Sequence, residues 1–215
     1  QAPVLVVAID GSYVDEATGN TVTLVAGDQL TSFIESIPAD GSAVTASVSP
    51  LTHAMTLSAQ TIASNGSSIT AAFSQVSSNA VSTFGFNPAT EKIFDPVSMP
   101  VTATPAQQKY AALLGGLSNL VKAAQDNHGM ASAGSFALVE AFAEDLVDGK
   151  LDGNGIGGGP INVASTTLPA LDASSLDALK NLANTFASSQ TNIANNVVAD
   201  LSGDPLTTQP TFTIS

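Results

Sequence analysis

The pattern of the chain changes abruptly at Ser49. Before this residue, short apolar or alternating runs are separated by turn signals such as Asp10-Gly11 and Asp40-Gly41, which is typical of strands. After it, apolar residues recur every three or four positions, which is typical of amphipathic helices. Such a chain has to pack a helical core beside a small sheet. We therefore predict an α+β fold, with a five-helix bundle combined with a small β-sheet.

Three strands are predicted in residues 1–48. They are the apolar run 4–9 and the alternating runs 21–25 and 43–48. Three short strands are too few for an independent sandwich. We expect residues 1–48 to be an incomplete, sandwich-like β segment that needs helices or further strands to cover it.

Five helices are predicted in residues 49–203. The clearest start signals are Ser49-Pro50 and Thr104-Pro105-Ala106-Gln107, each a capping residue followed by proline at the first helical position. The fifth helix begins near Asp172 or Ser174 and is expected to end at Gly203-Asp204-Pro205. The apolar stripes predict a core that includes Leu51, Met55, Ile62, Phe73, Val76, Phe84, Tyr110, Leu113, Leu117, Val139, Phe142, Leu179 and Phe186.

Residues 204–215 are predicted to form a C-terminal strand that returns to the sheet or joins a neighbouring subunit. This segment alternates at Thr211-Phe212-Thr213-Ile214, and the first strand begins almost at Gln1. Either processing created these two ends, or the chain is cut from a longer polypeptide. The partners we expect are therefore other copies of the chain or flanking domains, contacted through the terminal strands.

The charge of the chain limits its partners. Eighteen Asp and Glu residues stand against five Lys and Arg, which gives a formal net charge of −13. Such a chain has few cations with which to neutralise phosphates, so we expect no nucleic-acid partner.

No apolar run is long enough to cross a membrane. Solubility rests mainly on hydroxyl and amide groups, and surfaces of this kind are common on bacterial proteins that work outside the cell. We predict an extracellular or cell-surface location.

The chain has no cysteine, which excludes disulfides and thiolate metal sites. A calcium candidate remains in the glycine-rich loop 148–160, where Asp148, Asp152 and Asn154 supply hard oxygen ligands. An EF-hand register starting at Asp148 places Lys150 at the third ligand position and Gly159 where a bidentate Glu belongs. The loop is therefore either a tight connector or a calcium site. No other cofactor is predicted.

The sequence contains no pattern that marks a catalytic site. His53 lies in the first turn of a helix and His128 in a helix-ending turn, and both are expected to be structural. The adjacent carboxylates Asp15-Glu16 and Glu144-Asp145 are expected to be solvated surface. No Gly-x-Ser-x-Gly elbow occurs in the chain. We therefore predict that the chain has no catalytic residues and is not an enzyme.

Residues 48–54, with Ser49-Pro50-Leu51-Thr52, are the first of several segments that resemble a recurrent type of bacterial exported protein. Residues 81–86, 106–120 and 142–153 continue the resemblance, which extends from about residue 3 to 200. In that type, a carboxypeptidase-regulatory-like or immunoglobulin-like β segment leads into a helical domain that begins "TPLT". The resemblance implies a surface-anchored or secreted protein and brings no catalytic residues with it. The chain departs from the type by starting inside the β segment.

These observations favour a non-enzymatic extracellular structural module: a cell-surface stalk, an adhesin segment or the subunit of a surface filament. In one form of this hypothesis, a terminal strand of one copy completes the sheet of the next copy. In the other, the strands pair within the chain or with flanking domains. The alternatives are a calcium-dependent, glycan-binding or small-molecule-binding secreted module, and a hydrolase whose site is dispersed in the sequence.

Overall fold

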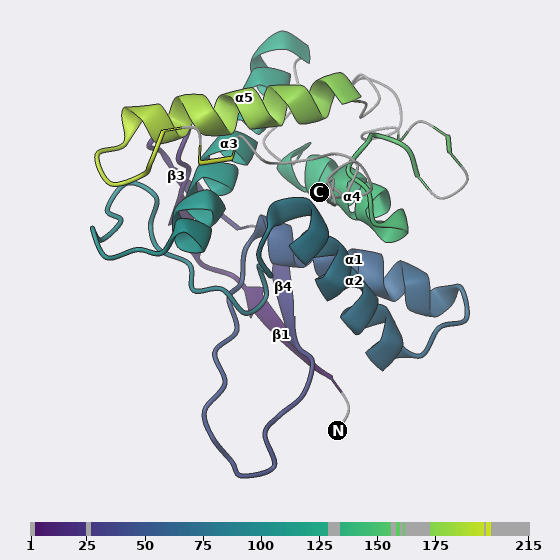
Figure 1. The fold of residues 1–215 in the computed structure, drawn as a ribbon. Helices are drawn as coiled ribbons and strands as arrows, with labels where there is room; N and C mark the ends of the chain where they lie inside the picture. Colours follow the sequence, from purple (N-terminus) through teal and green to yellow (C-terminus); the bar gives the residue numbers. More distant parts are fainter. Residues whose placement is uncertain are drawn as a thin grey trace, which may run out of the picture.

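The computed structural model describes residues 3–24, 27–128, 134–155, 158–159, 161, 173–195 and 197–198. Within these residues, four short strands precede five α-helices. Figure 1 shows the helices gathered on one side of the β1–β4 pair. The predicted α+β fold is confirmed. The strands form two separate two-stranded antiparallel sheets rather than one sheet. The predicted C-terminal strand, residues 204–215, lies outside the described residues.

The longer sheet consists of β1 (Val4–Ile9) and β4 (Gln29–Ile34). The two strands pair along their whole length, with Val4 opposite Ile34 and Ile9 opposite Gln29. β4 is buried at its centre, whereas every residue of β1 is at least partly exposed. The sheet is therefore covered over β4 and open over β1.

The shorter sheet is a hairpin of β2 (Ser12–Val14) and β3 (Thr21–Thr23). Asp15 closes its turn, since one carboxylate oxygen accepts hydrogen bonds from the backbone N–H and the hydroxyl of Thr18 at 2.8 and 2.7 Å. The other oxygen accepts a bond from the Ser118 hydroxyl at 2.7 Å. Asp15 was expected on the solvated surface, but it is half-buried and ties the hairpin to a helix.

The strand predictions differ from the structure at three places. The run 43–48 was expected to be a strand and is not one, whereas β2 and β4 were not expected. Ser47 anchors the run, because it donates from its backbone N–H to Ala89 O at 3.4 Å and from its hydroxyl to Glu91 O at 2.6 Å. An alternating pattern makes a strand only where a second strand offers a ladder.

The helices begin close to their predicted starts. Ser49 caps the first helix with a capping box to Thr52. Thr104 and Gln107 form the predicted capping box: the Gln107 N–H donates to the Thr104 hydroxyl at 3.2 Å, and the Thr104 N–H donates to the Gln107 side-chain oxygen at 2.9 Å. The fifth helix ends at Ser189, earlier than the predicted end near Gly203. The bounds are α1 Pro50–Ser64, α2 Ile69–Phe84, α3 Pro105–His128, α4 Gly134–Asp145 and α5 Ala173–Ser189.

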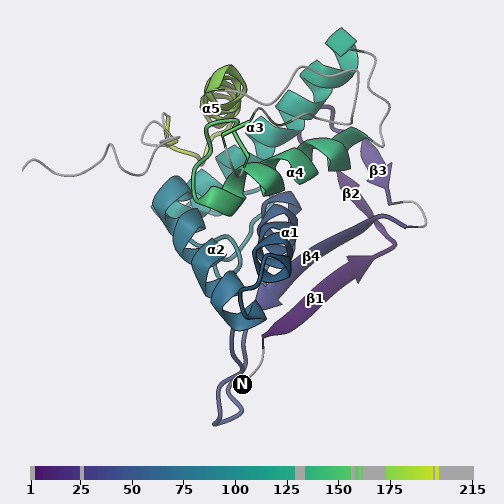
Figure 2. The same ribbon diagram turned by 90° about the vertical axis from the view of Figure 1, so that its right-hand side faces the viewer.

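The predicted stripes supply the core, and most of their apolar residues are buried. The apolar Ile69, at the start of α2, is exposed instead. α1 packs against β4, α2 and α4, and α3 packs along α5. Figure 2 shows β4 on the side of the sheet nearer α1, with β1 at the outer margin of the molecule. The helical layer therefore reaches β4 and stops there.

The contact of α3 with α5 is close because α3 carries two adjacent glycines. A Cβ at Gly116 would lie 2.7 Å from the Ala183 Cβ and 2.8 Å from the Ala183 Cα and N. A Cβ at Gly115 would meet the ring of Phe186. Backbone atoms cannot move aside as a flexible side chain can, so any larger residue at Gly116 forces the two helices apart.

We expect Gly116→Val to lower the free energy of unfolding by about 2–3 kcal/mol. Overpacking against Ala183 costs more than the helix gains from the replacement of a glycine. Asn181→Val, at an exposed position of α5, is the control and should change it by less than about 0.5 kcal/mol. Urea unfolding followed by circular dichroism measures both. Equal midpoints for the two variants would contradict the close contact.

Candidate functional site

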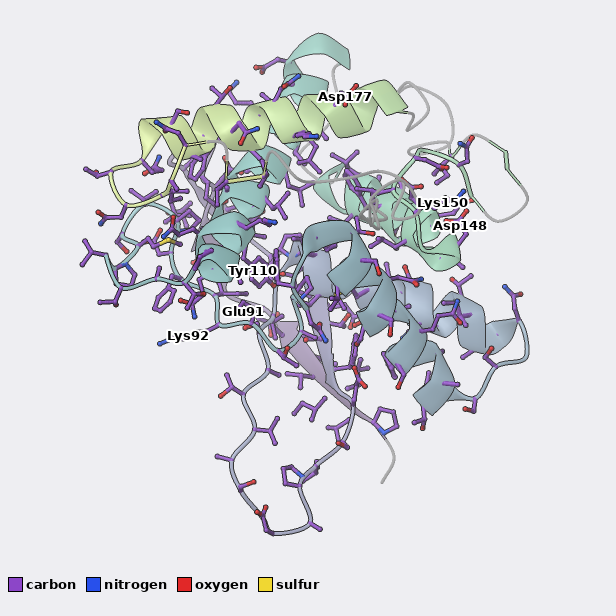
Figure 3. All side chains as sticks on the ribbon, viewed as in Figure 1. Glu91, Lys92, Tyr110, Asp148, Lys150 and Asp177 are labelled. Atoms are coloured by element: carbon purple, nitrogen blue, oxygen red, sulfur yellow. The ribbon has the colours of Figure 1, made fainter. Side chains whose placement is uncertain are left out.

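The three residues of the predicted calcium site lie just after α4. Asp148 ends the 3₁₀ turn Leu146–Asp148, and its Oδ1 accepts a hydrogen bond from the Lys150 N–H at 3.0 Å. Asp152 Oδ1 accepts bonds from the backbone N–H and the side-chain amide of Asn154, at 3.0 and 3.1 Å. Figure 3 shows Asp148 and Lys150 close together in this loop. Both carboxylates thus stabilise local turns.

A further carboxylate, Asp145, organises the same loop. We expected Asp145 on the solvated surface, and that prediction is wrong, because its side chain is 1% exposed. Its Oδ1 accepts a bond from the Asp152 N–H at 3.2 Å, and the Gly153 N–H lies 3.1 Å from each carboxylate oxygen. A buried carboxylate needs such donors in place of water. Asp145 therefore holds the loop against the end of α4.

Burial raises the pKa of Asp145 to about 7, although the N–H groups of Gly153 and Asp152 favour its charged form. The negative charges of Asp152 and Asp148 raise that pKa as well. The carboxyl group that anchors the loop therefore titrates near neutral pH.

Within the described part of the chain, no three His, Cys, Asp or Glu side chains are grouped as metal ligands. Calcium also accepts side-chain amide oxygens, such as that of Asn154. Calcium binding by Asp148, Asp152 and Asn154 therefore stays a prediction, and so does the alternative of a tight connector.

His53 packs in the interior, as expected. It is buried, and its Nδ1 lies 2.8 Å from the Thr31 hydroxyl on β4. The neighbouring Thr52 hydroxyl donates to the Thr31 carbonyl oxygen at 2.9 Å. Burial lowers the pKa of His53, so the imidazole is neutral at neutral pH. His128, the other histidine, ends α3, and its side chain lies outside the described side chains.

The same region joins α1 to α3. The Ser49 hydroxyl lies 2.7 Å from the Tyr110 hydroxyl, and it also accepts a bond from the Thr52 N–H at 3.2 Å. Tyr110 is 1% exposed, and burial raises the pKa of its hydroxyl far above the usual range, which keeps it protonated. The negative charge of Glu91 also raises that pKa, and Figure 3 labels both residues. We call this group the β4–α1–α3 joint; it comprises Thr31, Ser49, Thr52, His53 and Tyr110.

A small hollow of about 160 Å³ opens at the end of β4. Its walls are residues 33–36, Val44-Thr45 and Ala89-Thr90, and His53 is not among them. Ligand pockets for drug-sized molecules are usually about 300–1,000 Å³. The hollow and the joint are therefore separate features, and the histidine does not face this opening.

β1 carries exposed apolar side chains on one face of the sheet. Leu5, Val7 and Ile9 are 46%, 43% and 65% exposed. Their partners across the ladder include Phe33 and Thr31, which lie on the same face of the sheet and are 2% and 4% exposed. An uncovered apolar strand at the edge of a sheet is a ready template for pairing with another strand. We call residues 4–9 with their free side the β1 edge.

Compared with known proteins, the chain matches no family model, no curated protein and no solved structure at a significant level. The resemblance to bacterial exported proteins therefore stays an expectation.

The raised pKa of Asp145 predicts a pH dependence. An Asp whose pKa is higher in the folded chain than the usual 3.8 stabilises the fold fully below about pH 4, and this contribution is lost as the pH rises through about 7. The stability of the wild type relative to Asp145→Asn, which does not titrate, should fall over this window by an amount on the order of 2–4 kcal/mol. Urea unfolding of both chains from pH 4 to 8 measures it. A difference that grows with pH would show that the N–H donors outweigh burial.

The joint predicts unequal costs for two helix caps. Ser49→Ala removes the cap of α1 and the partner of the Tyr110 hydroxyl, and we expect a loss of about 2–3 kcal/mol. Ser68→Ala removes only the cap of α2, an exposed bond to the Ala71 N–H at 3.2 Å, and should cost about 1 kcal/mol. Thermal unfolding of both variants compares them. Equal losses would mean that the contact with Tyr110 contributes nothing.

Proposed function

We propose that the chain is a non-enzymatic structural module of a bacterial cell-surface or secreted assembly, such as a stalk, an adhesin segment or a fibre subunit. The β1 edge is the observation that carries this proposal. Sheet edges in proteins that act alone are usually shortened, charged, interrupted by proline or covered. β1 is six residues long, contains only aliphatic side chains and is exposed. An edge of this kind suits a protein that is joined to a neighbour.

The helical body supports the proposal because its buried hydroxyls connect secondary-structure elements. Ser49 contacts Tyr110 across α1 and α3, and Thr52 binds Thr31 across α1 and β4. Hydrogen bonds within the interior fix the relative positions of the groups they join. A module that presents the β1 edge to a neighbour needs such bonds, because they hold the sheet in a fixed position relative to the helices.

The charge of the chain supports an extracellular location. A formal net charge of −13, with five Lys and Arg residues, repels nucleic acid and anionic lipid headgroups. None of the described helices combines the length and apolar character needed to cross a bilayer. The proposed partners are protein strands, since strand addition depends on backbone hydrogen bonds and apolar side chains rather than on charge.

The proposal predicts how a single charge at the β1 edge affects assembly in the source cells. Val7→Lys places an ammonium group on the exposed face of β1 and should release the chain from high-mass surface complexes. Val81→Lys, at a position of α2 with 47% exposure against 43% at Val7, is the matched control and should leave the complexes intact. Sedimentation of surface extracts compares the variants, and antibody labelling of intact cells locates the chain. Labelling only after permeabilisation, or equal sedimentation of the two variants, would contradict the proposal.

A further inference from the structure

The β1 edge has properties that restrict what can pair with it. One side of β1 is bonded to β4, and no other strand of the described chain pairs with it. Between Val4 and Ile9 there is no charge, no proline and no glycine, which are the usual means of blocking an edge. The pair β1–β4 is a sheet of only two strands, and helix α1 packs against β4.

We infer that β1 pairs antiparallel with β1 of a second copy, about a two-fold axis, to give the four-stranded sheet β4–β1–β1–β4. This inference rests on the proposed function and names the partner at the β1 edge. An isologous contact of this type closes on itself, because each copy gives the same surface that it receives. The smallest assembly unit is therefore a dimer rather than an open chain of strands.

Charge favours the antiparallel direction. In the antiparallel arrangement, the two Asp10 residues lie at opposite ends of the paired strands, about 20 Å apart at 3.4 Å per residue. This separation exceeds the Debye length of about 8 Å at physiological salt. Glu35 of the second copy lies two strands away from Asp10, at about 10 Å. Parallel pairing would instead set Asp10 beside Asp10 at about 5 Å, in a chain whose net charge is already −13.

The two-fold axis also restricts the register. Residues that face each other across an antiparallel pair lie on the same face of the sheet, so an axis perpendicular to the sheet must pass midway between the two copies of one residue, which then face each other. An axis at Val7 sets Val7 opposite Val7 and Leu5 opposite Ile9. An axis at Val6 leaves Ile9, the most exposed residue of β1, beyond the paired strands. The geometry therefore favours Val7 at the axis.

The space beside β1 permits this contact. α1 packs on β4, and Figure 2 shows β1 at the margin with no helix drawn alongside its outer edge. Leu5, Val7 and Ile9 face the same side of the sheet as the helices, but the helical layer ends at β4. In the dimer, these side chains of the two copies cover one another.

Single cysteines test the direction and the register, because the native chain has none. Cysteine is introduced singly at each of positions 4–9 in the full chain, and disulfide formation is followed under mild oxidation. A disulfide needs a Cα–Cα distance of about 4.4–6.8 Å. Facing residues of an antiparallel pair satisfy this, whereas residues two positions away are about 8 Å or more apart. We expect Val7→Cys to give the most cross-linked dimer, with Val81→Cys as the exposed control.

Other patterns overturn the inference. Equal cross-linking at all six positions indicates parallel pairing, a maximum at Val6→Cys indicates the other axis, and no preference over Val81→Cys indicates no pairing between β1 strands. Light scattering of the wild type gives a check that needs no cysteine. We expect the mass of two chains, with at least about tenfold weaker association for Val7→Lys than for Val81→Lys. A monomer at high concentration contradicts the dimer.

Deleting residues 204–215 separates this inference from pairing within the chain. If the C-terminal segment of the same chain covers β1, the full chain is a monomer and only the shortened chain dimerises, which overturns the inference. Open-ended oligomers that disappear on the deletion also overturn it, since they indicate exchange of the C-terminal strand. In either case, surface labelling and the sedimentation of Val7→Lys still test the proposed function separately.

Discussion

The arrangement of this protein depends on a buried polar joint where β4 meets α1 and α3. Thr52 donates to the Thr31 carbonyl oxygen, and Ser49 shares a hydrogen bond with Tyr110. Losing one partner in such a place leaves a buried polar group without a bond, which costs far more than an exposed hydrogen bond contributes. The joint therefore fixes which strand of the sheet lies under the helices. Because that strand is β4, β1 is carried at the margin with its apolar side chains uncovered.

A second constraint is the shortage of cations. The chain has five Lys and Arg residues, and several of its carboxylates are held instead by hydroxyl and N–H donors. Asp15 is held by Thr18 and Ser118, and Asp145 by the backbone of the loop after α4. Such donors satisfy a carboxylate without neutralising it, so a buried one such as Asp145 keeps a raised pKa. A surface of this composition also favours contacts through apolar strands over contacts through ion pairs.

Much of the fold was predictable because helix signals are local. The caps at Ser49 and Thr104 and the apolar stripes behind them need only residues within a few positions. The strands were less predictable, since β4 is buried on both faces and does not alternate, whereas the alternating run 43–48 lacks a ladder partner. The burial of Asp145 escaped prediction because its donors belong to a loop that folds back on it. The exposure of β1 was not visible either, since an apolar run predicts a buried strand.

The central claim is that the outer side of β1 is unpaired within one chain and pairs between chains. Amide hydrogen exchange of β1, followed by NMR over a range of protein concentrations, tests it most directly. Alternate amides of β1 point toward β4 and away from it. We predict that the inward amides are protected at every concentration, and that the outward ones become protected only as the concentration rises. Protection of all β1 amides at high dilution would contradict the claim, because it would show an edge already covered.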